Sequence, residues 1–163
     1  MGSLRNALSS RLGGLVALAA IMLAGLAGCS KQERETVPVG CFGDPAELMS
    51  ALRQAPGVVA LQDGTWLSRC VSAARTDGDL QSLGFSFGRL ADVLRARSRT
   101  DVSAALQLGY LAGAVQAGAR RAPGAVADQL ARRMQQLAVL EPGARPAAAS
   151  ALTRGLRAGE GRG

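Results

Sequence analysis

One pentapeptide has the form of a catalytic motif in which a serine between two glycines is the nucleophile. Gly84-Phe85-Ser86-Phe87-Gly88 matches the G-x-S-x-G pattern, where the serine lies on a sharp strand-to-helix turn and a histidine accepts its proton. The chain contains no histidine, and its single lysine, Lys31, is distant in the sequence. The motif also falls within a helical pattern of apolar residues. We therefore expect Ser86 to be non-catalytic and the protein not to be an enzyme, because histidine is the commonest general acid and base near neutral pH.

Two carboxylates, those of Asp77 and Asp79, have the spacing that opens a calcium-binding loop. Such a loop next requires a ligand, a glycine and a bidentate glutamate, and the sequence has Gln81, Ser82 and Gly88 at those positions. We interpret the two aspartates as the acidic first turn of a helix. The sequence therefore predicts no metal site and no cofactor.

The first 28 residues have the features of an export signal. Arg5 and Arg11 make the start basic, the run 12–27 has no charge, and Leu26-Ala27-Gly28-Cys29 follows. This arrangement resembles the lipobox of bacterial lipoproteins. The resemblance implies a diacylglyceryl thioether on Cys29 and cleavage before it, so that the mature chain is held on a membrane by lipid. The alternative is an uncleaved membrane helix, but 16 uncharged residues are fewer than the roughly 20 that span a bilayer.

Two cysteines remain after Cys29, namely Cys41 and Cys70. An exported domain lies in a compartment where thiols oxidise, so we expect a disulfide between them. It would close a loop of about 30 residues and stabilise the fold by roughly 3 to 4 kcal/mol in the chain-entropy model. The alternative is two buried free thiols, and a metal site made of two cysteines is less favoured still.

The sequence divides into four parts after these assignments. Residues 1–28 are the signal peptide, and residues 29–40 are a polar, non-periodic tether. Residues 41–141 form the expected helical domain. The segment 142–163 is rich in alanine, glycine and arginine, with only Leu152 and Leu156 as large apolar residues, so we expect it to be weakly helical or disordered.

Alanine and leucine supply most of the apolar residues, which favours helices over strands. Apolar spacing and cap residues predict helices that begin near Asp44, Thr65, Asp77, Asp101 and Val126. The third has the clearest stripe: Leu80, Leu83, Phe87, Leu90 and Leu94. One short run, 58–61, could be a strand or an extended link, but it has no partner strand. We therefore predict an all-α bundle of four to five helices.

Four glycines interrupt two of these helices at intervals of four residues. Gly84 and Gly88 belong to the third predicted helix, and Gly109 and Gly113 to the fourth. Glycine inside a helix costs up to about 1 kcal/mol, so a compensating close contact is expected. The simplest contact is a crossing of these two helices at their glycines. The alternative is a groove that admits a lipid chain or a partner helix.

Basic residues concentrate in the second half of the chain, where residues 89–163 contain 12 arginines and five acidic residues. This excess favours an anionic neighbour, such as phospholipid headgroups or acidic wall polymers. The alternative is that arginines at helix ends stabilise the helix dipoles. Nucleic acid is not an expected partner, since the export signal takes the chain away from it and no binding motif is present.

The leading functional hypothesis is a non-catalytic lipoprotein, anchored to the cell membrane or outer membrane and facing the extracytoplasmic side, that binds an envelope component or an unknown protein partner. The alternative is a carrier of a small apolar or lipid ligand between helices. An open groove lined by Leu83, Phe87, Gly109 and Gly113 would favour the carrier, whereas a closed core there would favour the interaction module.

Overall fold

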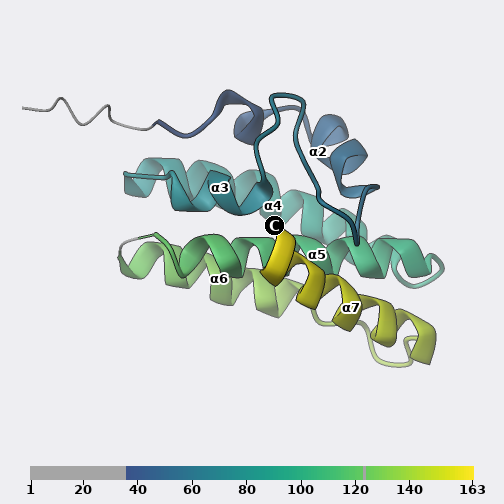
Figure 1. Cartoon of the computed structure of the whole chain (residues 1–163). Helices are drawn as coiled ribbons and strands as arrows, with labels where there is room; N and C mark the ends of the chain where they lie inside the picture. The colour runs from purple at the N-terminus through teal and green to yellow at the C-terminus, as the bar shows by residue number, and fades with distance from the viewer. Residues whose placement is uncertain (1–35, 123) are drawn as a thin grey trace, which may run out of the picture. The chain divides into compact units, whose positions relative to one another are not determined.

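The computed structural model describes residues 36–122 and 124–163, and the regular elements in these residues are all helical (Figure 1). They are the 3-10 helix η2 (Val39–Phe42) and the α-helices α2 (Pro45–Leu52), α3 (Leu67–Ser72), α4 (Asp77–Arg97), α5 (Val102–Ala119), α6 (Ala125–Leu137) and α7 (Pro146–Arg162). The predicted all-α fold is confirmed, with six α-helices in the described residues instead of four or five. The predicted signal peptide, Cys29 and the first part of the tether lie outside the described residues.

No helix within residues 36–122 and 124–163 is long and apolar enough to cross a bilayer.

Side-chain caps start three of the helices where the sequence predicts them. Asp44 caps α2 by accepting the N–H of Ala46 at 2.7 Å. Thr76 and Asp79 form a reciprocal capping box at the start of α4. Asp101 caps α5. Such caps satisfy otherwise unpaired N–H groups and each contributes about 1 kcal/mol, so these boundaries are set locally.

The predicted disulfide is present and joins η2 to α3. Cys41 and Cys70 are both fully buried, and their Cα atoms are 5.5 Å apart. The chain between α2 and α3 contains the ambiguous run 58–61, which is an extended link. Its one ladder contact is an isolated antiparallel bridge between Ala60 and Trp66. The disulfide therefore holds η2, at the start of the body, against helix α3, which follows this link.

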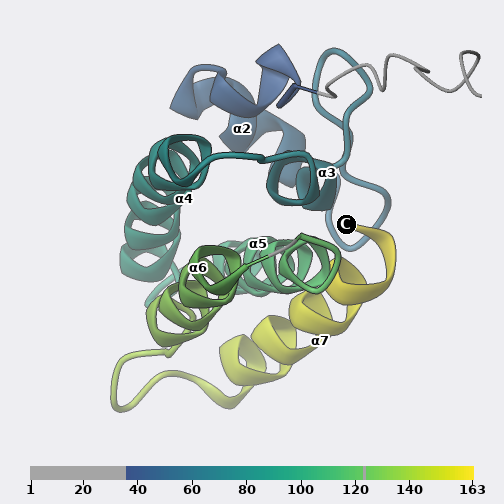
Figure 2. The same ribbon diagram turned by 90° about the vertical axis from the view of Figure 1, so that its left-hand side faces the viewer.

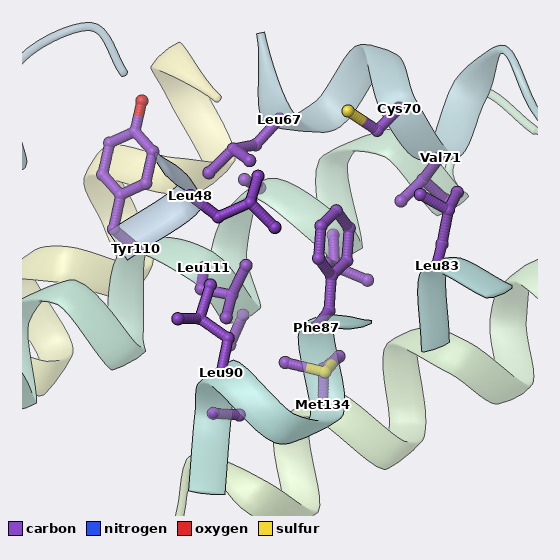
Figure 3. Close-up of a cluster of buried hydrophobic side chains, with 14 of the residues drawn as sticks. Leu48, Leu67, Cys70, Val71, Leu83, Phe87, Leu90, Tyr110, Leu111 and Met134 are labelled. Carbon is purple, nitrogen blue, oxygen red and sulfur yellow. The ribbon is translucent and has the colours of Figure 1, made fainter. Parts of the chain in front are cut away.

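Helix α5 lies at the centre of the helical body, with α3, α4, α6 and α7 around it (Figure 2). It is buried on nearly every side, as expected for a helix that is apolar all round. Tyr110 is buried on it, and its hydroxyl accepts the N–H of Val59 at 3.1 Å, which fixes the extended link to the core. Large apolar side chains from five helices form the buried cluster drawn in Figure 3: Leu48, Leu67, Leu83, Phe87, Leu90, Leu111 and Met134.

The prediction for the last segment is wrong, because α7 is a well-formed helix of 17 residues packed along α5. Its buried positions are Ala148, Ala151, Gly155 and Gly159, which are all small. Small residues bring two helix backbones together, and burial then comes from backbone contact instead of large side chains. Because the segment has only Leu152 and Leu156 as large apolar residues, its apolar pattern underestimates this helix. The preceding helix, α6, ends at Leu137.

Candidate functional site

Gly109 and Gly113 lie at a close helix crossing, but their partner is α7 and not α4. A Cβ atom added to Gly109 would lie 2.1 Å from the carbonyl oxygen of Leu152, and one added to Gly113 would lie 2.2 Å from that of Leu156. Real Cβ atoms almost never approach other atoms within 3.0 Å. The expectation that the two glycine pairs face one another is therefore wrong. The glycines of α5 allow the close approach of α7, which lies in the segment predicted to be weakly helical or disordered.

The contact is reciprocal, because α7 presents glycines with the same spacing. A Cβ atom on Gly155 would lie 2.0 Å from the carbonyl oxygen of Leu106, and one on Gly159 would lie 2.1 Å from that of Tyr110. The glycines of each helix therefore pack against backbone carbonyl oxygens of the other helix. The spacing of these two glycines is visible in the sequence and could have revealed the pairing.

No ligand-sized space is left at the positions where the sequence hypothesis placed a groove. Leu83 and Phe87 are fully buried in the core, and α7 covers Gly109 and Gly113. A closed interior between α4 and α5 is the arrangement that we associate with an interaction module rather than with a carrier.

The second glycine pair is placed differently, on the floor of a surface hollow between α4 and α6. A Cβ atom on Gly84 would lie 3.3 Å from Cδ1 of Leu130, and one on Gly88 would lie 3.9 Å from a guanidinium nitrogen of Arg133. These are contacts with the ends of side chains, not with a backbone. The hollow has a volume of about 580 Å³. We call it the α4–α6 groove.

The edge of the α4–α6 groove combines an exposed aromatic ring with charges of both signs. Phe85 is 64% exposed, and the guanidinium of Arg89 lies over its ring at 5.6 Å from the centroid. Arg133 lines the groove from α6, and Asp77 and Asp92 line it from α4. An exposed phenylalanine whose ring is contacted by a cation is suited to bind an apolar part of a partner. The surrounding charged side chains can then pair with polar groups of that partner.

Two sequence patterns that resemble reactive sites lie within helix α4 and at its start. Ser86 lies in the middle of α4, without the strand-to-helix turn that the G-x-S-x-G motif requires. Asp79 is occupied as a cap: hydrogen bonds from the N–H of Arg75 and from Thr76 lower the pKa of its carboxyl group. In the described part of the chain, no group of three cysteine and acidic side chains could hold a metal ion.

The arginines at the end of α4 are paired with carboxylates. Arg95 and Arg99 each lie 3.6 Å from Glu141, and Arg97 lies 3.5 Å from Asp101. These pairs are exposed and contribute little stability individually. Each of these three arginines therefore has a carboxylate partner, either just after the helix or in the loop after α6.

Trp66 directly precedes α3. Its side chain is half exposed, beside a hollow of about 400 Å³ lined by Arg69 and Arg121. An isolated antiparallel bridge joins Trp66 to Ala60.

No family model, no curated protein and no solved structure matches the chain.

Proposed function

We propose that the protein is a lipid-anchored extracytoplasmic lipoprotein whose helical body is a non-catalytic interaction module of the cell envelope. The anchor rests on the lipobox that ends at Cys29. The buried disulfide supports the compartment, because such bonds persist where thiols are oxidised. The partner is an envelope component or another protein.

The observation that carries the interaction role is the contrast between the interior and the α4–α6 groove. The interior is closed at Gly109 and Gly113, whereas the groove leaves Phe85 exposed and backed by Arg89. Aromatic residues, phenylalanine included, and arginine are enriched at protein interfaces compared with the rest of the surface.

The anchor is tested by Cys29→Ser in the native host, followed by membrane fractionation. We expect the variant to leave the membrane fraction while the disulfide still forms, because Cys29 is separated from the folded body. A variant that is still processed and still pellets with membranes contradicts the lipoprotein assignment.

The interaction role is tested with a photo-crosslinking amino acid placed at Phe85. The matched control carries it at Val139, which is 61% exposed but does not line the groove. A discrete covalent adduct from position 85 that is absent from position 139 supports the module. Equal or absent labelling at both positions argues against it.

The carrier hypothesis has one specific observation in its favour, since the α4–α6 groove has the volume for a small apolar ligand and Leu80, Val126 and Leu130 line it. Gly88→Leu would fill this space. Mass spectrometry of the purified protein distinguishes the roles: a lipid that co-purifies with the wild type and is lost from the variant favours the carrier.

A further inference from the structure

The α4–α6 groove runs between two helices that point in the same direction. Gly84 of α4 lies beside Leu130 of α6, and Gly88, about one turn later, lies beside Arg133. Residue numbers therefore rise together along the two helices. Figure 2 shows α4 and α6 next to one another on one side of α5.

The two ends of this groove carry opposite charge. Asp77 lines the end at which α4 begins. Arg89, Asp92 and Arg133 line the other end, where two guanidinium groups and one carboxylate leave a net positive charge. The part between the ends is lined by apolar side chains, those of Leu80, Val126 and Leu130.

The charges at both ends are available to a partner. In the described part of the chain, the ion pairs lie at the end of α4, and none includes Asp77, Arg89 or Arg133. Arg89 contacts the ring of Phe85 instead of a carboxylate. A partner that brings an acidic group to the basic end and a basic group to the acidic end therefore fits this groove.

A second copy of the chain has this order of charges. A twofold axis perpendicular to α4 lays a second α4 antiparallel to the first, and any contact between two different residues is then made twice. Placing Asp77 of one copy opposite Arg89 of the other also places Arg89 of the first opposite Asp77 of the second. These residues are 12 positions apart, about 18 Å along a helix that rises 1.5 Å per residue.

The same register places the exposed aromatic ring near the centre of the contact. Phe85 of each copy lies opposite Gln81 of the other, within about one helical turn of the axis. Phe85 is 64% exposed in the single chain, and Gly84 beside it has no side chain that would obstruct an approaching helix. An apolar centre flanked by charged pairs is the usual composition of a protein interface.

We infer that the α4–α6 groove pairs two copies of this chain across a twofold axis, with Asp77 of each copy against Arg89 and Arg133 of the other. The inference rests on the proposed function, in which this groove is the binding surface, and names the partner as a second copy. Such a pairing closes on itself, so the assembly is a dimer and not a filament.

Reversing one charge at a time tests this pairing in the full acylated chain, purified in detergent and studied by sedimentation equilibrium. We expect the wild type to dimerise, with a Kd that rises with salt concentration. Asp77→Arg places like charges opposite one another twice in each dimer, and so does Arg89→Asp. Each substitution should raise the Kd at least about tenfold, because like charges across an interface are strongly unfavourable.

The decisive measurement mixes the two variants. In a dimer of one Asp77→Arg chain and one Arg89→Asp chain, both contacts again join opposite charges, because one contact is native and the other is reversed. Two different affinity tags should therefore co-purify from the mixture as they do from the wild type. This recovery also shows that both variants are folded.

The matched controls are Asp128→Arg and Arg132→Asp. Both residues are exposed on α6, and neither lines the groove. Each control should dimerise with the Kd of the wild type.

Three results overturn the pairing: a wild type that stays monomeric, groove variants that dimerise as well as the controls, or a mixture that does not recover. The photo-crosslinker at position 85 separates this failure from that of the proposed function. An adduct with a molecule other than this chain overturns the pairing and leaves the interaction role intact. No labelling beyond that at position 139 overturns both.

Discussion

Gly113→Ala is the smallest substitution that tests the crossing of α5 and α7. The new Cβ atom would lie 2.2 Å from the carbonyl oxygen of Leu156, at least 0.8 Å closer than real Cβ atoms come. The obstacle is backbone, so no rotamer change can relieve it. The two helices must separate, which loosens the reciprocal contact of Gly159 as well.

The expected change in the free energy of unfolding of Gly113→Ala results from two opposing effects. In an unconstrained helix, alanine in place of glycine stabilises by about 0.5 to 1 kcal/mol. Overpacking typically costs about 1 to 3 kcal/mol, and more when backbone must move. We expect a net loss of about 2 to 3 kcal/mol in the free energy of unfolding. For a body of this size, that corresponds to a fall of about 6 to 15 °C in Tm.

Gly161→Ala is the matched control on α7. No atom lies within 4 Å of the position that its Cβ would take, so only the gain in helix propensity operates and Tm should hold or rise. Thermal unfolding followed by circular dichroism compares the two variants. Hydrogen exchange should also show faster exchange of the α7 amides in Gly113→Ala alone. If Gly113→Ala is as stable as Gly161→Ala, the close crossing described above does not exist.

Three further predictions concern contacts in the rest of the body. Tyr110→Phe removes the acceptor for the buried N–H of Val59 and should lower the free energy of unfolding by about 1 to 3 kcal/mol in urea titration; an unchanged midpoint argues against the bond. Cys41→Ser combined with Cys70→Ser should lower it by about 3 to 4 kcal/mol, and reduction should destabilise only the wild type. Hydrogen bonds hold the pKa of Asp79 below its usual 3.8, so its contribution is present above that value and is lost as pH falls through the lower pKa of the folded state. Asp79→Asn should flatten the decline of stability between about pH 5 and pH 2; an unchanged slope contradicts this.

Local features of the sequence were enough to place most of the helices. Asp44, Thr76 and Asp101 are cap residues next to periodic apolar runs, and capping acts within three residues of the helix start. The disulfide could be predicted from the number of cysteines, because only Cys41 and Cys70 follow Cys29 in the chain. The exclusion of a nucleophile elbow at Ser86 followed from the helical spacing around it.

The packing of those helices was decided by tertiary structure. Gly84 and Gly113 have the same local pattern, yet one lies on the floor of a groove beside Leu130 and the other lies against the backbone of α7. Nothing within three or four residues distinguishes them, because the partner of a small-residue face is a distant segment.

Helix α7 shows the difference most clearly. Its glycines lower helix propensity, so a local interpretation makes the segment weak or disordered. In the fold, Gly155 and Gly159 allow α7 to lie against the backbone of α5, and burial of Ala148 and Ala151 along the same face adds to the contact. The sequence by itself determined where most of the helices begin. Tertiary structure decided which glycines are buried. Close packing against α5 stabilises α7, whereas the helix propensity of its own residues is too low to do so.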